Sequence, residues 1–152
     1  TGLTLRRYPV GTSVVGIDLS AEMLRKAEKR AQTVRERKVD LHLMDAEDLK
    51  FPDNSFDCVT VPYVLSVTPN PQRLIAEARR VCKPGGAILI VNPFSGAGFW
   101  KTLEKVSQRY ASKIGFRSMF DFADIILSED WAVLKVKSVN LLGLSKLVSI
   151  RN

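Results

Sequence analysis

Two short apolar runs, each closed by an acidic residue, restrict most strongly what this chain can fold into. The first run covers residues 14–18 and ends at Asp18, and the second covers residues 39–44 and is followed by Asp45. Between them, from Ser20 to about residue 37, apolar residues recur at helical spacing, with Ser20 as the expected N-cap. This strand–helix–strand order predicts parallel strands, whose acids lie at the edge where α/β sheets bind ligands.

The same alternation continues along the chain. We expect strands at residues 56–61 and 87–92, and between them a helix at residues 69–81 that is stopped by Lys83-Pro84-Gly85-Gly86. A helix at 96–114 and a loop at 115–130 that covers the site follow. Residues 131–142 and 144–150 read as an antiparallel pair around Gly143. The predicted fold is therefore α/β, a Rossmann-like doubly wound and mostly parallel sheet with a terminal antiparallel hairpin.

The length of 152 residues, with 45% hydrophobic residues, indicates one domain that spans residues 1–152. The chain opens on Thr1-Gly2, with Leu3, Leu5 and Tyr8 behind them. This pattern is typical of the end of a glycine-rich turn that enters a helix. We therefore expect that an amino-terminal segment, which includes the first strand of the fold, is missing from this sequence.

The formal charge of +7 and the pI near 9.6 favour an anionic partner, which could be a membrane surface, a nucleic acid or an acidic protein. The basic residues are not interleaved with aromatic residues, so we favour a lipid surface over nucleic acid. No stretch approaches the roughly 20 apolar residues of a transmembrane helix. Cys58 and Cys82 read as reduced core cysteines, which suits a cytoplasmic protein.

Three segments carry a resemblance to a known family. They are Gly-Ile-Asp-x-Ser-x-Glu-Met-Leu from Gly16, Asp-Ala-Glu-x-Leu-x-Phe-Pro-Asp-Asn-Ser-Phe-Asp from Asp45, and Lys-Pro-Gly-Gly from Lys83. Residues 1 to about 91 thereby resemble the class I S-adenosylmethionine-dependent methyltransferases. Within that superfamily, residues 1–9 and 139–152 are most similar to the bacterial phosphatidylethanolamine N-methyltransferases.

The resemblance implies a set of cofactor-binding residues. Asp18 would bind the ribose hydroxyls, Asp45 the adenine amino group, and the Ala46 backbone N–H a ring nitrogen of adenine. The remaining residues expected at the cofactor are Thr1, Gly2, Leu19, Met23, Glu47 and Tyr63. Simpler interpretations stay open at this point: Asp18 could cap the next helix, and the acidic loop that begins at Asp45 could be only solvated.

Tyr63 follows the strand at residues 56–61, where the family's transferred methyl group faces the acceptor. Tyr63 and Asn92 are our candidates for catalytic positioning of the acceptor, although Tyr63 could also be a core aromatic residue. His42 lies inside a predicted strand, which argues for packing rather than catalysis. We expect no metal site, since methyl transfer needs none. Asn92-Pro93-Phe94 departs from the family's Asn-His-Phe, which argues against a histidine-assisted mechanism.

By this resemblance, the protein would methylate phosphatidylethanolamine stepwise towards phosphatidylcholine with S-adenosylmethionine as cofactor. It would work as a peripheral protein on the cytoplasmic surface of the inner membrane, and no nucleic acid is expected as a partner. Two alternatives stay open. One is a methyltransferase that acts on a quinone precursor or another small molecule. The other is a non-catalytic nucleotide-binding module, or a dinucleotide-binding oxidoreductase on a similar sheet.

Overall fold

The computed structural model describes residues 1–93, 132–139 and 145–152, and these form two compact units. The first unit is Thr1–Lys50 and the second is Phe51–Asn152. We describe each unit by itself. The helix predicted at residues 96–114 and the covering loop predicted at 115–130 lie outside the described residues.

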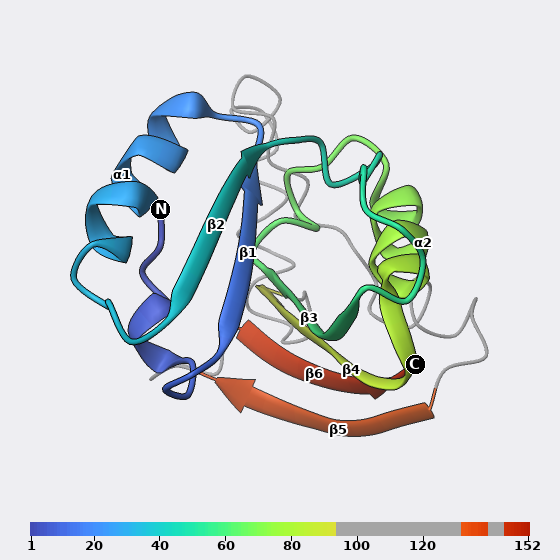
Figure 1. The fold of residues 1–152 in the computed structure, drawn as a ribbon. Coiled ribbons are helices and arrows are strands. Elements are labelled where there is room, and N and C mark those ends of the chain that lie inside the picture. The colour runs from blue at the N-terminus through green and yellow to red at the C-terminus, as the bar shows by residue number, and fades with distance from the viewer. Residues whose placement is uncertain (94–131, 140–144) are drawn as a thin grey trace. The chain divides into compact units, whose positions relative to one another are not determined.

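The first unit is the strand–helix–strand element that the sequence predicts. It contains the 3-10 turn η1 (Leu5–Arg7), β1 (Ser13–Asp18), α1 (Ala21–Ala31) and β2 (Lys38–Leu43). β1 and β2 pair in parallel, in a register that runs from Ser13 opposite Lys38 to Asp18 opposite Leu43 (Figure 1). Gly16 permits close packing between these strands, because a Cβ on it would lie 2.7 Å from Leu41 Cδ2.

Helix α1 begins where the sequence predicts but ends earlier. The Ser20 hydroxyl accepts a hydrogen bond from the Met23 N–H at 3.3 Å, which is the expected N-cap. The expected end near residue 37 is wrong, because α1 ends at Ala31. Thr33 Oγ1 donates to the Arg30 carbonyl at 2.7 Å, and the N–H of buried Val34 donates to the Ala31 carbonyl. These hydrogen bonds between residues three apart form turns that replace the next turn of the helix.

The helix expected after Thr1-Gly2 is only the three-residue 3-10 turn η1. Pro9 follows closely, and a proline disfavours the helical conformation of the residue before it. Tyr8 accordingly has an extended backbone, with φ −71° and ψ 148°.

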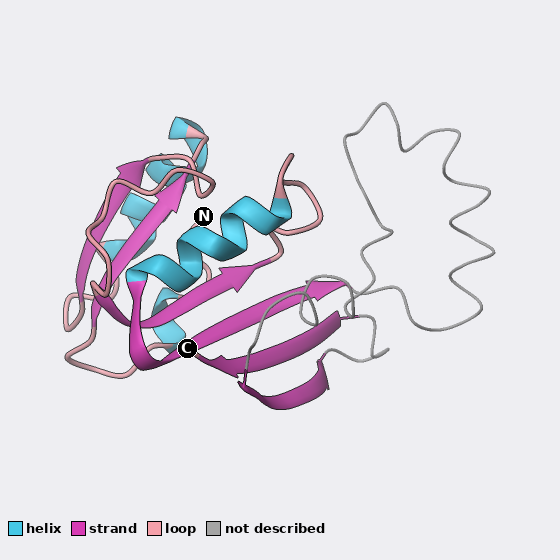
Figure 2. Cartoon of the chain, turned by 90° about the vertical axis from the view of Figure 1, so that its right-hand side faces the viewer, coloured by secondary structure: helices cyan, strands magenta, loops and turns pink. Residues whose placement is uncertain are grey.

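The second unit is a four-stranded sheet with one described helix. Its elements are β3 (Phe56–Pro62), α2 (Pro71–Val81), β4 (Cys82–Pro93), β5 (Ala132–Val139) and β6 (Ser145–Arg151). The strand order is β3-β4-β6-β5 (Figure 1), and Figure 2 shows the strands in magenta and the helices in cyan. β3 and β4 are parallel, whereas β6 is antiparallel to both β4 and β5. The predicted terminal antiparallel hairpin is therefore confirmed.

One face of this sheet forms the core of the second unit. Ile88 and Ile90 of β4 lie opposite Ile150 and Val148 of β6, and all four are at most 1% exposed. Opposite residues of an antiparallel pair share a face, so these side chains form one apolar layer. Helix α2, which packs against β4, buries its own apolar side in the same unit, at Pro71, Leu74, Ile75, Ala78 and Val81.

Strand β4 starts earlier than the sequence predicts. Lys83-Pro84-Gly85-Gly86 does follow the end of α2, but these residues belong to β4 rather than to a separate turn. The pairing with β3 shifts here, from Phe56 opposite Cys82 to Cys58 opposite Ala87. Gly85 has φ +76°, which only glycine adopts readily, and this allows the irregular segment to continue into the strand.

Asn152 ties the end of the described chain to the junction of α2 and β4. Its Nδ2 donates to the carbonyls of Arg79 at 3.1 Å and Cys82 at 2.9 Å, and its backbone pairs with Gly85 and Gly86. Carbonyls at a helix end lack intrahelical partners, so this amide side chain acts as a C-terminal cap. No helix among the described residues is both long and apolar enough to cross a membrane.

Candidate functional site

The two acids that the sequence singles out lie at the same end of the first unit. Asp18 is the last residue of β1 and lies opposite Leu43, the last residue of β2. The Met44 N–H donates to the Asp18 carbonyl at 3.1 Å, so the parallel pairing extends to one residue before Asp45. Both acids therefore follow the carboxyl ends of neighbouring parallel strands, where α/β sheets bind ligands.

Asp18 contributes to the start of α1 and keeps one oxygen available. Its Oδ1 accepts a hydrogen bond from the Ser20 N–H at 2.9 Å. This bond forms a turn that leads into α1, whereas the helix itself is capped by the Ser20 hydroxyl and not by Asp18. Within the described part of the chain, Asp18 Oδ2 accepts no hydrogen bond. A half-buried carboxylate with a fixed orientation and one open oxygen can accept from a ligand hydroxyl.

Asp45 has a similar local arrangement. Its Oδ1 accepts from the Glu47 N–H at 2.8 Å, and its carbonyl accepts from the Asp48 N–H at 3.2 Å. Among residues 1–93, 132–139 and 145–152, no acceptor is bound to the Ala46 N–H and no donor to Asp45 Oδ2. The loop thus presents an acceptor and a neighbouring donor, which is the pair that an adenine edge requires.

Apolar side chains are exposed beside these acids. Leu19 is 69% exposed immediately after Asp18, and Met23 lies half-buried in the first turn of α1. Leu43 is 63% exposed opposite Asp18 and is a candidate that the sequence pattern did not predict. Its position near the end of the apolar run, two residues before Asp45, is the signal that could have found it. Exposed leucines at a strand edge provide apolar surface for a planar ring.

Thr1 and Gly2 contact α1. The Arg30 guanidinium donates to the Thr1 carbonyl, and a Cβ on Gly2 would lie 3.1 Å from Ala27 Cα. Gly2 also has φ +74°. Glycine is therefore required here by its conformation and by its close approach to α1. Binding of cofactor by Thr1 and Gly2 stays a prediction.

Tyr63 and Asn92, the candidates for acceptor positioning, lie in the second unit. Tyr63 directly follows β3 and has φ 58°, a left-handed conformation that bulky residues rarely adopt. Its N–H donates to the Val91 carbonyl at 2.6 Å, which joins it to the residue before Asn92. The residue is 53% exposed, so Tyr63 is not a core aromatic. Asn92 is 1% exposed, on the β4 face that carries Ile88 and Ile90.

Other polar groups of the described residues form local pairs. His42 lies within β2 as predicted, with Nε2 3.1 Å from Asp40 Oδ2, but it is half-exposed rather than packed inside. At the start of β3, Lys83 Nζ lies 2.7 Å from Asp57 Oδ1 and lowers the pKa of that carboxyl. No group of three or more metal-ligating side chains occurs among the described residues.

The two cysteines differ in their environments. Cys82 is buried, but Cys58 is exposed, so the expectation that both are core residues is wrong for Cys58. Cys58 lies on β3 on the face opposite to buried Val61, because successive strand residues alternate between faces. Desolvation raises the pKa of both thiols. Neither cysteine therefore has the lowered pKa of a catalytic thiolate.

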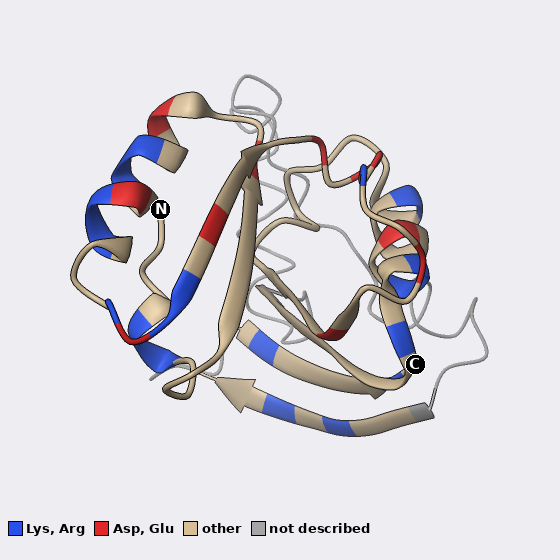
Figure 3. Ribbon diagram, in the orientation of Figure 1, with Lys and Arg blue, Asp and Glu red and all other residues tan. Residues whose placement is uncertain are grey.

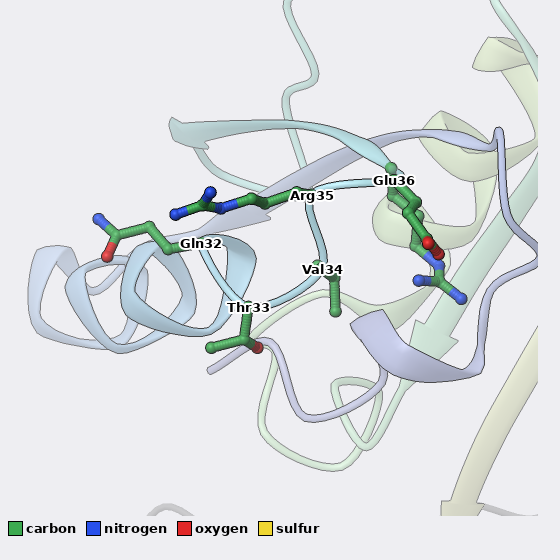
Figure 4. Close-up of a pocket in the computed structure, with 6 residues that line it drawn as sticks. Gln32, Thr33, Val34, Arg35 and Glu36 are labelled. Carbon is green, nitrogen blue, oxygen red and sulfur yellow. The ribbon is translucent and has the colours of Figure 1, made fainter.

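A pocket of about 480 Å³ lies in the segment between α1 and β2, lined by residues 32–37. Their side chains point in different directions rather than toward one centre (Figure 4). This segment leads into the amino end of β2, whereas Asp18 and Asp45 follow the carboxyl ends of the same strand pair. The pocket is therefore separate from the candidate cofactor site.

The strand-end acids lie in a segment that matches a known protein family. A family model described as "Methyltransferase domain" matches residues 1–90. The chain belongs to this family. S-adenosylmethionine is the methyl donor of the family.

Related proteins extend the match beyond these residues. The chain is 39% identical over 122 residues to phosphatidylethanolamine N-methyltransferase of Cereibacter sphaeroides, covering 79% of this chain and 60% of that relative. It is 44% identical over 72 residues to the ubiquinone/menaquinone biosynthesis C-methyltransferase of Cupriavidus taiwanensis, covering 47% of this chain and 28% of the relative. The chain thus spans less than two thirds of the length of these relatives.

A solved structure supports the fold. The S-adenosylmethionine-dependent methyltransferase structure from Methanosarcina mazei superposes with a TM-score of 0.67 at 23% identity, covering 91% of this chain and 81% of that one. The fold is the α/β methyltransferase fold, with parallel strands and a carboxyl-terminal antiparallel hairpin.

Proposed function

We propose that this protein transfers methyl groups from S-adenosylmethionine to the amine of phosphatidylethanolamine, in the synthesis of phosphatidylcholine. Binding of S-adenosylmethionine is supported by the pair of oriented carboxylates at the carboxyl ends of β1 and β2. Phosphatidylethanolamine as the methyl acceptor is supported by the 39% identity, over 79% of this chain, to a phosphatidylethanolamine N-methyltransferase.

The first unit would hold the nucleoside part of the cofactor. Asp18 Oδ2 accepts from the ribose hydroxyls, while the Ser20 N–H keeps the carboxylate in position. Asp45 Oδ2 accepts from the adenine amino group and the Ala46 N–H donates to a ring nitrogen. The remaining residues of the proposed cofactor site provide apolar or backbone contacts: Thr1, Gly2, Leu19, Met23, Leu43 and Glu47.

The bound cofactor supplies an activated methyl group on a sulfonium. Transfer to an amine requires alignment, exclusion of water and a neutral nitrogen lone pair, so no acid or nucleophile of the protein is obligatory. The exposed Tyr63 ring and hydroxyl orient the amine acceptor. We assign buried Asn92 a positioning role near the end of β4. It directly follows Val91, whose carbonyl accepts the hydrogen bond from the Tyr63 N–H, so it would hold Tyr63 in place through the backbone.

The test is an acceptor assay with S-adenosylmethionine labelled in its methyl group. The protein is offered phosphatidylethanolamine in detergent micelles, and methylated lipids are separated by thin-layer chromatography. We expect label in mono-, di- and trimethylated phospholipid, and a Tyr63→Ala variant whose kcat/KM falls by a larger factor than its affinity for S-adenosylhomocysteine. Binding of S-adenosylhomocysteine without any lipid product would reject the phospholipid acceptor.

A second candidate has support from one comparison. The chain is 44% identical over 72 residues to a quinone C-methyltransferase, a match that covers 47% of this chain, compared with 79% for the phosphatidylethanolamine N-methyltransferase. Label in a demethylated quinone precursor, with none in phospholipid, would establish this function instead.

A further inference from the structure

The outer strand of the second unit, β5, exposes apolar side chains beside lysines. Val133 is 40% exposed, Leu134 54% and Val136 46%, and the intervening Lys135 and following Lys137 are also exposed. β5 is the last strand in the order β3-β4-β6-β5, so only one of its edges pairs with another described strand.

A β-bulge in β5 determines which side chains of this strand lie on each face of the sheet. The register shifts between Val133, opposite Ile150, and Lys135, opposite Ser149, which leaves Leu134 as the extra residue. Val133 and Val136 share a face with buried Ile150 and Val148. Lys135 and Lys137 therefore lie on the other face, and the exposed edge of β5 is bordered by apolar side chains on one side and basic ones on the other.

The charged residues of the described strands β4, β5 and β6 have one sign. β5 and β6 together carry Lys135, Lys137, Lys146 and Arg151 and no acidic residue. The adjoining strand β4 also has no acid. Within the described residues, none of these four cations has a salt bridge or hydrogen-bond partner on its side chain. Figure 3 shows the basic residues as bands along β5 and β6.

We propose that this β5 edge, formed by residues 133–137 with Arg151 of β6, is the surface by which the protein docks on an anionic lipid bilayer. Exposed apolar side chains, interleaved with lysines that have no ion-pair partner among the described residues, match the two parts of a membrane interface, the acyl boundary and the anionic headgroups. The inference deepens the proposed function and rests on it, since the acceptor would lie in that bilayer.

Two other occupants fit less well. A second copy that paired through β5 would bring its own Lys135 and Lys137 to the same edge, and like charges oppose such pairing. Single-stranded nucleic acid binds to basic grooves through stacking aromatic side chains, and the fifteen residues of β5 and β6 contain none.

Vesicle sedimentation tests the proposal. The protein is mixed with vesicles of phosphatidylcholine alone or of phosphatidylcholine with phosphatidylglycerol, at low and high salt. The variants are Lys135→Gln/Lys137→Gln and Leu134→Ser. A matched control is Lys29→Gln/Lys38→Gln, which removes the same charge from two exposed lysines of the first unit. Circular dichroism confirms that each variant is folded.

We expect salt-sensitive binding to the anionic vesicles, weakened about 10- to 30-fold by the β5 lysine substitutions, because each lysine near an anionic surface contributes about fivefold. The control variant Lys29→Gln/Lys38→Gln should weaken vesicle binding by a factor whose logarithm is less than half of that for the β5 lysine variant. Leu134→Ser should weaken vesicle binding at both salt concentrations. Equal losses in the β5 and control variants, or binding to an oligonucleotide but not to vesicles, would overturn the proposal.

The assay also separates this inference from the proposed function. If the lysine variant loses vesicle binding but methylates micellar phosphatidylethanolamine at the normal rate, both are supported. If it keeps normal vesicle binding and the protein methylates micellar lipid, the docking surface is wrong and the proposed function stands. If vesicle binding is lost as expected but no phospholipid is methylated in any form, the docking surface stands and the acceptor is wrong.

Discussion

At the scale of single residues, the backbone of Tyr63 distinguishes it from the other candidates. Two non-glycine residues have positive φ among those described, Asn54 at 56° and Tyr63 at 58°. Asparagine is common in the left-handed region, whereas a bulky aromatic residue there is strained. Strained residues cluster at functional sites, where surrounding structure maintains them. The exposure of the Tyr63 ring and its strained backbone together favour a functional role over a packing role.

We therefore predict that replacing Tyr63 lowers activity strongly but changes stability little. A Tyr63→Gly variant removes the strain but also the contacts of the side chain, so its free energy of unfolding should change by less than about 1 kcal/mol. Its kcat/KM should fall by about 10-fold or more, because the acceptor loses its orienting group. Urea unfolding and the micelle assay measure the two quantities, and Asn54→Gly is the control for the backbone effect. A large loss of stability with unchanged activity would assign Tyr63 a structural role.

The Asp57–Lys83 ion pair gives a pH dependence with a defined sign. Lys83 lowers the pKa of Asp57 below that of an unfolded aspartate, so the pair stabilises the fold above the unfolded pKa. That contribution is lost as the pH falls through the lower, folded pKa. Asp57 is largely exposed, and the effect is therefore small. The difference in unfolding midpoint between the protein and Asp57→Asn should be present at neutral pH and vanish in acid. A constant difference would contradict this assignment.

At the scale of elements, Asn152 of the sheet region forms hydrogen bonds to the junction of α2 and β4. Its amide donates to two carbonyls at the end of α2 and the start of β4. Asn152→Asp keeps the shape but removes the donors, and it should lower the free energy of unfolding by about 1 to 2 kcal/mol. Asn152→Gln, which retains the amide on a longer side chain, should recover part of the loss. Urea unfolding of Asn152→Asp with an unchanged midpoint would show that the cap is dispensable.

The elements also show which structural features the sequence makes predictable. The strand ends at Asp18 and before Asp45, the Ser20 cap and the terminal hairpin follow from local patterns, and the structure contains all of them. The end of α1 at Ala31 depends on the burial of Val34, which helical spacing alone does not reveal. The incorporation of Gly85-Gly86 into β4 depends on tertiary pairing with β3 and with Asn152.

The candidate site was predictable to the same extent. Asp18, Asp45 and Ala46 could be selected because strand ends and acidic residues are visible in a sequence. Leu43 was missed because its exposure depends on being the last residue of its strand. The strain at Tyr63 and the exposure of Cys58 are likewise properties of the folded backbone.

At the scale of the whole molecule, the prediction of one domain for residues 1–152 stays a prediction, and the two compact units make it testable. A single domain unfolds cooperatively. Native-state hydrogen exchange in increasing urea should then give the same global free energy for the slowest amides of β1 and β4. Two separate global values would indicate that the units unfold independently.

The central claim is that the carboxylates at the ends of β1 and β2 bind S-adenosylmethionine, and isothermal titration with S-adenosylhomocysteine tests it most directly. The protein should bind in the micromolar range. Asp18→Asn should bind at least about 10-fold more weakly, because a hydrogen bond to a charged acceptor is lost. The control Asp40→Asn changes another exposed carboxylate of the same strand pair and should bind normally. Equal affinity of the protein and Asp18→Asn, or no binding by the protein at all, would contradict the claim.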